Sequence, residues 1–337
     1  MIHTLNIPEN HIYDLDSVRR NAQKVFREMF ESVCQSIQRL DGNAFVQHCW
    51  IRDKNGILIP TENRDDAVYV DRVLHNGRVL EKVGVNYVAI EGKLPPGMTF
   101  QKSGALITGE ADRMSSDSGT PYFATGASFV IHPHNPMVPV AHANYRYFQV
   151  GDATQPSYWW FGGGADLTPS YFFEEDVVHF HKVHKAVCDQ HDPSYYARFK
   201  KWCDDYFFIR HRGETRGIGG IFFDQLNDYD PQKILAFITD CTEAFVHAYM
   251  PIVERRKDMS FTKENKYWQR LVSGRYVEFI LTSDRGIRFG LESGMVSQQS
   301  IFNCMPPGAS WQYDDQPSPG SEEAMLREVL KNTREWV

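Results

Sequence analysis

Cysteine is sparse in this sequence of 337 residues, and the six cysteines that occur are widely separated. No pair has the C-x-x-C spacing of a redox or zinc motif, and six thiols are too few to crosslink a chain of this length. Long apolar runs are also missing, since no stretch approaches the roughly 18 residues that cross a bilayer. We therefore expect reduced, mostly buried thiols and no transmembrane segment.

Blocks of basic residues are absent as well. The formal net charge is −7, and lysine and arginine are dispersed along the chain. A nucleic-acid-binding protein needs a basic surface to neutralise phosphates, so we expect small-molecule chemistry and no nucleic-acid partner. Residues 1–18 have neither the apolar core of a signal peptide nor the Arg-rich, acid-poor composition of a transit peptide. This composition predicts a cytoplasmic protein.

The order of helical and strand patterns indicates a single α+β domain over residues 1–337, with residues 1–15 as an N-terminal extension. Apolar residues recur at helical spacing from 18 to 40. Short β-rich runs follow up to 148, and helix-start signals return between 170 and 273. The next segment, 274–291, favours two strands joined by a surface turn at 283–286, and a helix closes the chain. We expect one mostly antiparallel sheet with helices around it.

The stretch AHANYRYF, residues 141–148, carries the strongest signal for chemistry. Alternation along a strand puts His142, Asn144 and Arg146 on one face. Tyr145 and Tyr147 fall on the other face. An imidazole, an amide and a guanidinium on one face can hold an anionic ligand and transfer a proton beside it. A plain solvent-facing polar edge is the alternative interpretation.

Two neighbouring segments have the composition of ligand-positioning loops. Ser128 and His132 precede a proline-rich loop that must stay extended. YWWFGGGADLTP, residues 158–169, places aromatic residues and three glycines before Asp166. It has neither the Walker lysine nor the G-x-G-x-x-G spacing of a phosphate loop. A tight turn among core aromatics and a wall for a flat ligand both fit this composition.

A second glycine run, at 217, 219 and 220, leads into the apolar segment IFFD. Because a strand rather than a helix follows, these glycines do not form a phosphate cradle. We predict a close-packed turn into the sheet. Charged residues precede this turn, and we expect them to brace it as one polar network: His211, Arg212, Glu214 and Arg216.

Histidines are frequent and raise the question of a metal site. His181 and His184 share a helix face through their i, i+3 spacing, and His132, His142 and His211 lie elsewhere. The zinc-binding patterns H-x-x-x-H and H-E-x-x-H do not occur in the sequence. We therefore predict no metal ligands.

Five segments together resemble the family of oxygen-dependent coproporphyrinogen III oxidases: SFVIHPHNP, HANYRYF, WWFGGGADLTPSY, KKWCDDYFFIRHRGETRGIGGIFFD and GRYVEFILTSDRG. The resemblance extends from about residue 16 to the C-terminal REWV. The 25-residue segment at 200–224 has an unusual mixture of residues, which makes it a far more specific signal than a lone glycine motif.

The resemblance implies an enzyme of haem biosynthesis. Two propionates of coproporphyrinogen III become vinyl groups, giving protoporphyrinogen IX, carbon dioxide and hydrogen peroxide, with molecular oxygen as co-substrate. It further implies a large antiparallel sheet flanked by helices, no metal or organic cofactor, and a homodimer whose interface lies near residues 276–311.

The same resemblance implies roles for individual residues. His142 is the proton donor or acceptor, with Asp166 as a further acid–base candidate. Asp284 faces the pyrrole nitrogens, and Arg285 and Arg146 bind propionates. The substrate contacts form a larger set: Ser128, Asn144, Tyr145, Arg146, Tyr276, Val277 and Glu278.

Two other functions fit parts of the sequence. A histidine-metal oxygenase would use His132, His142, His181 and His211, and a porphyrin carrier would use aromatic residues and arginines without chemistry. One segment also departs from the family pattern, because residues 292–303 contain no arginine where other members have one. We therefore assign no substrate contact to that segment.

Overall fold

The computed structural model describes most of the chain, namely residues 13–54, 57–62, 66–94, 99–101, 113–115, 119–151, 156–293 and 298–337. The described part is built around one eight-stranded sheet with the strand order β12-β9-β8-β7-β4-β3-β1-β2. All of its strand pairs are antiparallel, which confirms the predicted sheet. Its strands are β1 (Val46–Arg52), β2 (Leu58–Thr61), β3 (Tyr69–His75), β4 (Leu80–Lys93), β7 (Pro121–Pro133), β8 (Val140–Gly151), β9 (Pro156–Thr168) and β12 (Gly220–Leu226).

Two small two-stranded sheets accompany the large one: β5 (Thr99–Gln101) with β6 (Arg113–Ser115), and β10 (Phe208–Ile209) with β11 (Glu214–Thr215). The helices are α1 (Leu15–Asp41), α2 (Glu174–His191), α3 (Tyr195–Tyr206), α4 (Pro231–Arg256), α5 (Lys263–Thr282), α6 (Arg285–Ser293), α7 (Gln298–Phe302) and α8 (Glu322–Lys331). None of the helices in the described part is long and apolar enough to cross a membrane.

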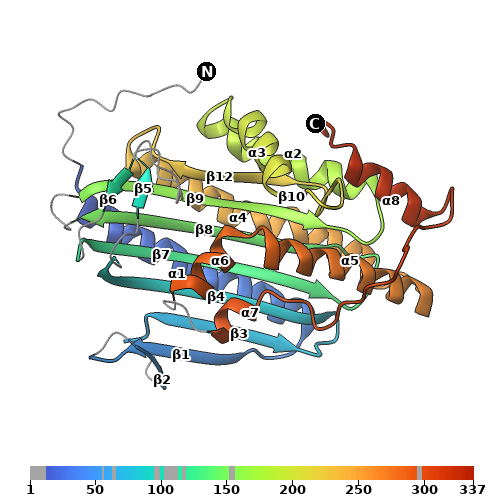
Figure 1. The fold of residues 1–337 in the computed structure, drawn as a ribbon, viewed down its shortest axis with the longest axis horizontal. Helices are drawn as coiled ribbons and strands as arrows, with labels where there is room; N and C mark the ends of the chain where they lie inside the picture. The colour runs from blue at the N-terminus through green and yellow to red at the C-terminus, as the bar shows by residue number, and fades with distance from the viewer. Residues whose placement is uncertain are drawn as a thin grey trace.

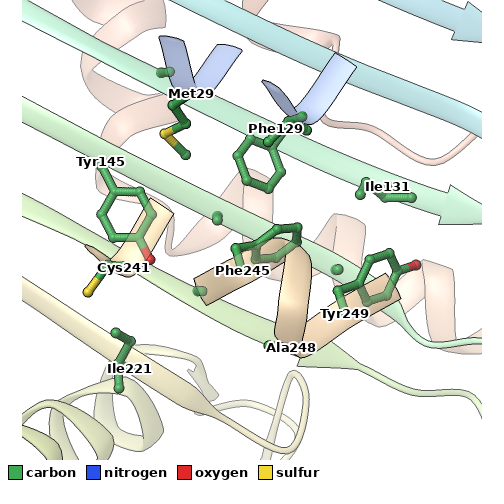
Figure 2. Packing of buried hydrophobic residues seen from close by; sticks show 14 of the residues in the cluster. Met29, Phe129, Ile131, Tyr145, Ile221, Cys241, Phe245, Ala248 and Tyr249 are labelled. Atoms are coloured by element: carbon green, nitrogen blue, oxygen red, sulfur yellow. The ribbon is translucent and has the colours of Figure 1, made fainter. Parts of the chain in front are cut away.

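The first helix, α1, begins and ends where the sequence predicts. Asp14 accepts a hydrogen bond from the Ser17 N–H at its start, and Gly42 ends it with φ of +87°. Its buried apolar side chains pack against the sheet together with α4. Figure 2 shows this core from close by, with Phe129 facing Phe245 of α4 and Tyr145 lying beside Cys241.

The opposite face of the sheet carries α5, α6 and α7 (Figure 1). A second, smaller apolar cluster lies there, and it contains Phe207, Phe222, Tyr276 and Phe279. The helices thus lie on both faces of one antiparallel sheet, which confirms the predicted α+β fold of a sheet flanked by helices. All six cysteines are free and five are buried, which confirms the expected thiols.

The predicted hairpin at 274–291 is wrong, because this segment forms the end of α5 and the start of α6. Its aromatic and β-branched residues have high strand propensity, which favours a strand when the segment is considered alone. In the structure, Tyr276, Phe279 and Ile280 are buried at helical spacing against the second apolar cluster. The capping box of Thr262 and Asn265 starts this helix, and its two residues lie twelve and nine residues before the first residue of the segment.

The glycines at 162–164 do not form a turn but lie inside β9. A Cβ on Gly163 would be 2.4 Å from the Tyr145 ring, and one on Gly164 would be 2.3 Å from the Ile221 oxygen. The second glycine run forms the close-packed turn that the sequence predicts. Gly219 has φ of +78°, and a Cβ on Gly220 would be 2.0 Å from the Ala165 oxygen.

Candidate active site

The polar face of the sheet, opposite α1 and α4, contains a chain of three hydrogen-bonded side chains, namely an imidazole, a carboxylate and a guanidinium. His142 on β8 and Asp166 on β9 are direct cross-strand partners. Asp166 Oδ1 lies 2.7 Å from His142 Nδ1, and its other oxygen accepts from Arg216 Nη2 at 2.5 Å. Asp166 and Arg216 are buried, whereas His142 is partly exposed. The strand pairing therefore places a titratable imidazole against an immobilised ion pair.

Electrostatics determine which nitrogen of His142 carries the proton. Burial alone would raise the pKa of Asp166, but the charges and hydrogen bonds of Arg216 and His142 outweigh it and lower this pKa. An ionised carboxylate can only accept hydrogen bonds, so His142 Nδ1 is the donor. The other ring nitrogen, Nε2, is then the one that can exchange a proton with a ligand.

A pair of arginines lies farther along the same face. Asp224 Oδ1 is 2.9 Å from Arg146 Nη2, and Asp224 Oδ2 is 3.7 Å from Arg285 Nη2. Burial opposes the charge of Arg146, yet Asp224 outweighs it and raises the pKa of the guanidinium. The arginine side chains are 36% and 45% exposed, so two cationic groups remain open to an anionic ligand beside the acid–base pair.

Aromatic side chains lie between these charged groups. The Tyr206 ring stacks on Phe222 at 4.1 Å, and Arg285 lies 5.1 Å from the centre of the Tyr206 ring. The Tyr206 hydroxyl donates to Asp284 at 3.3 Å and accepts from the Arg285 N–H. Asp284 also accepts from the Ile287 N–H and so caps α6. Asp284 and Arg285, predicted at a hairpin tip, therefore lie at the start of the helix α6.

Ser128 and Asn144 belong to a row of polar residues across the sheet. Asp71, Asn86, Ser128 and Asn144 are successive register partners on β3, β4, β7 and β8, so they share the polar face. Asn86 donates to Asp71 at 2.5 Å, and Ser300 from α7 donates to the other oxygen of Asp71. Burial raises the pKa of Asp71 to about 6. The row leads to a cleft of about 870 Å³ between α7 and the strands β1, β2 and β3.

Tyr145 is a predicted substrate contact that the structure places elsewhere. Its ring is fully buried in the core under α4, beside Cys241 (Figure 2). Because the side chain points away from His142 and Arg146, it cannot contact a ligand on the polar face. This orientation follows from the strand alternation, which the family resemblance alone does not take into account.

The predicted contacts on α5 differ in their surroundings. Tyr276 is buried, with its ring 4.7 Å from the Arg216 guanidinium, and its hydroxyl has no hydrogen-bond partner among the described residues. Glu278 accepts from His211, Arg212 and Trp311, and these hydrogen bonds, led by that of Arg212, lower its pKa to about 2. Val277, which lies between these two residues in the sequence, is partly buried.

The expected polar network at 211–216 is divided among three acidic groups. His211 and Arg212 bind Glu278, and Arg216 binds Asp166. Glu214 instead accepts from Arg275 and Arg327, which tie α5 and α8 to β11. The prediction of one network was therefore wrong, because each side chain is drawn to the nearest opposite charge on a different element.

The four histidines of the metal hypothesis have separate partners. His132 Nε2 is 3.0 Å from the Cys304 oxygen, and His181 uses both nitrogens, toward Tyr196 and the Ile218 oxygen. Burial lowers the pKa of His132 to about 4 and that of His181 to about 3. Within the described ranges, no group of three or more His, Cys, Asp or Glu side chains is arranged to hold a metal ion.

Sequence reasoning missed three residues of this site as functional groups: Tyr206, Arg216 and Asp224. Arg216 was assigned only to bracing, and Asp224 ends an apolar run. These residues belong to the site because the pairing of β12 with β9 brings the segment 200–224 beside Asp166 and Arg146, and no short-range spacing in the sequence reveals that pairing. The only local signal was their position within the 25-residue segment that carries the resemblance. The segment without the expected arginine, 292–303, lies partly outside the described residues, which omit 294–297.

The sequence was compared with known proteins. The family described as coproporphyrinogen III oxidase matches residues 21–336. An oxygen-dependent coproporphyrinogen-III oxidase of Glycine max, named as chloroplastic, is 44% identical over 98% of this chain and 84% of its own length. A chloroplastic coproporphyrinogen-III oxidase 1 of Arabidopsis thaliana is 46% identical over 95% of this chain and 80% of its own length. A mitochondrial oxygen-dependent coproporphyrinogen-III oxidase of Homo sapiens is 42% identical over 97% of this chain and 70% of its own length.

The names of these relatives contradict the cytoplasmic location that the sequence predicted. They place the relatives in chloroplasts or mitochondria. The prediction depended on the lack of a targeting pattern in residues 1–18.

Proposed function

The chain belongs to the coproporphyrinogen III oxidase family, and from this premise we propose that the polar face of its sheet is the active site. The function is the oxygen-dependent oxidative decarboxylation of coproporphyrinogen III to protoporphyrinogen IX in haem biosynthesis. One observation carries the location of the site. The acid–base pair His142 and Asp166 shares a face with two open arginines and an aromatic stack.

The chemistry of the reaction defines what the site must do. Each reacting propionate, as its carboxylate, loses carbon dioxide, one proton and two electrons. Molecular oxygen takes up the two electrons, that proton and one further proton from the solvent, and so becomes hydrogen peroxide. An electron-rich porphyrinogen can react with oxygen directly, so the protein mainly orients the arm, transfers protons and excludes water. We therefore propose that no resident metal or organic cofactor takes part.

Arg146 and Arg285 bind propionate carboxylates in this proposal. A guanidinium presents several N–H donors in a plane, which suits a carboxylate, and partial burial strengthens such contacts. Asp284 accepts from pyrrole N–H groups, and the ring lies against Tyr206 and Phe222. Ser128 and Asn144 offer further polar contacts farther along the face.

His142 transfers the proton. Its Nδ1 is held by Asp166, which leaves Nε2 for the substrate or for reduced oxygen. Arg216 keeps Asp166 ionised, and Asp166 thereby orients the imidazole and stabilises its protonated form. Asp166 acts in this assignment through His142 rather than by direct contact with the substrate.

We also propose a homodimer with an interface near residues 276–311. Support comes from exposed apolar side chains in this region: Leu281, Leu291, Phe302 and Trp311. Tyr276 itself is buried within its own chain, so the interface would use the outer surface of α5 and the elements after it. Sedimentation at assay concentration should give a mass of twice 38.9 kDa. A monomer alone would contradict this part.

The activity is tested by incubating the protein with coproporphyrinogen III under air and under nitrogen. We expect carbon dioxide and protoporphyrinogen IX under air and neither under nitrogen, with activity retained after exhaustive chelation. Binding without carbon dioxide release under air would instead identify a carrier. Loss of activity on chelation that a divalent metal restores would contradict the cofactor-free proposal.

A further inference from the structure

Asp224 lies at an irregularity in the edge strand β12. The pairing of β12 with β9 shifts register between Phe223 and Leu226, and Gln225 has φ of +55°. A non-glycine residue in this conformation is strained, and bulges of this kind commonly redirect a neighbouring side chain. The Gln225 N–H donates to Asp224 Oδ1 at 3.0 Å, so the distortion itself holds the carboxylate.

The redirected carboxylate contacts both arginines of the polar face. One oxygen lies 2.9 Å from Arg146 Nη2 and the other lies 3.7 Å from Arg285 Nη2. Asp224 is only 13% exposed, whereas both arginines are much more open. An arginine has five N–H donors, so contact with one carboxylate oxygen leaves others for a ligand.

Two neighbouring features fit this arrangement. Gly162 on β9 is the register partner of Arg146, and a Cβ there would be 2.7 Å from Asp224 Oδ1 and 2.8 Å from Arg146 Nη2. Only glycine leaves room for the ion pair. On the other side, Tyr206 lies under the Arg285 guanidinium and is itself fixed by stacking on Phe222.

We propose that Asp224 is a positioning and specificity residue for the substrate carboxylate, holding Arg146 and Arg285 side by side as one binding clamp. This inference rests on the proposed function of the site. The two guanidinium groups share one carboxylate and carry like charges, so they repel each other. The negative charge of Asp224 offsets that repulsion. The three groups together carry a formal charge of +1, which one propionate neutralises.

This charge balance suits a substrate whose arms react in turn. A propionate that has become a vinyl group has no charge and loses its attraction to the clamp. The clamp can then take the carboxylate of the next arm. Without Asp224, two uncompensated arginines would be displaced from each other and would bind a single carboxylate less well.

The test compares two substitutions that remove the same charge. Asp224→Asn keeps the size of the side chain and an oxygen for the Gln225 N–H. Asp228→Asn is the matched control, because Asp228 is 18% exposed and pairs with Arg198 at 2.6 Å four residues farther along the chain. We expect Asp224→Asn to raise KM for coproporphyrinogen III about tenfold with kcat within threefold. Asp228→Asn should leave KM within twofold. Asp224→Glu keeps the negative charge and should raise KM less than Asp224→Asn does.

Equilibrium binding provides a readout that does not depend on turnover. The oxidised tetracarboxylate coproporphyrin III should bind Asp224→Asn about tenfold more weakly than the wild type. Turnover by the wild type tests the proposed function separately from the role of Asp224. If the wild type shows no turnover, the binding comparison still tests Asp224, and if Asp224 has no role, turnover still tests the function. An unchanged KM and Kd in Asp224→Asn, or a fall in kcat alone, would overturn the inference.

A double variant tests whether Asp224 acts through the arginines. Arg285→Ala should raise KM by about tenfold or more, since it removes a charge-assisted contact. If Asp224 positions Arg285, the double variant Asp224→Asn/Arg285→Ala should lose clearly less than the product of the two single effects. Multiplicative losses would mean that Asp224 acts independently of Arg285 and would contradict the clamp.

Discussion

On β8, Tyr145 and Tyr147 point into the core formed with α1 and α4, whereas His142 and Arg146 point to the opposite face of the same sheet. The core face contains mainly apolar and aromatic side chains, which stabilise the fold by burial. The polar face holds Asp166, Arg216 and Asp224 at the cost of desolvating their charges. Buried ion pairs contribute little net stability. On this face they lie beside the partly exposed side chains of His142, Arg146 and Arg285, and that arrangement indicates chemistry.

The strongest way to test this difference is to remove the charge of Asp166. Asp166→Asn keeps the shape, but it leaves Arg216 buried without a counter-charge. It also leaves a single acceptor oxygen where Arg216 and His142 Nδ1 each use one, so the His142 tautomer is no longer fixed. We expect kcat/KM to fall about a hundredfold or more. The free energy of unfolding should fall by about 3–5 kcal/mol.

A matched control for Asp166→Asn is Asp204→Asn on α3. Asp204 also pairs with a buried cation, Lys200, at 2.6 Å, but it lies outside the proposed site. The control should lose stability while kcat/KM stays within about threefold. Equal losses of activity in both variants would mean that Asp166 affects activity only through folding.

A smaller effect should follow from Glu278, whose charge on α5 is stabilised by His211, Arg212 and Trp311. Its pKa in the folded protein is about 2, below the ordinary value of 4.5. The ionised carboxylate therefore stabilises the fold above about pH 4.5, and this contribution is lost as the pH falls toward 2. At neutral pH, Glu278→Gln should cost about 1–3 kcal/mol.

Urea unfolding of the wild type and Glu278→Gln at several pH values measures this contribution directly. The difference between the two proteins should be constant from pH 7 to 5 and should shrink below pH 4.5. A difference that does not change with pH would show that Glu278 stabilises the fold by packing rather than by charge.

The smallest effect is expected on the core face, from Tyr145→Phe. The Tyr145 hydroxyl lies beside the Cys241 thiol and has no hydrogen-bond partner among the described residues. Its removal should change the unfolding free energy by less than about 1 kcal/mol and kcat/KM by less than about twofold. A tenfold loss of activity would place the Tyr145 side chain in the site and would contradict the division between the two faces.

The sequence predicted local structure and the alternation of β8 well, because both depend on neighbouring residues. It therefore placed His142, Asn144 and Arg146 together on one face. It failed at 274–291, where burial of Tyr276 and Phe279 against other elements overrides strand propensity. It also missed the clamp, because Arg146 and Asp224 lie 78 residues apart and meet only when β8, β9 and β12 pair. Long-range pairing of this kind leaves no pattern in a single sequence.

The most direct test of the central claim is hydrogen–deuterium exchange with and without bound coproporphyrin III. We predict that the tetracarboxylate slows exchange around Tyr206 at the end of α3, in β12 and at the α5–α6 junction. Exchange in α1 should stay unchanged, because α1 packs on the core face. Protection confined to α1 and α4, with none around Asp224 and Arg285, would contradict the assignment of the polar face as the active site.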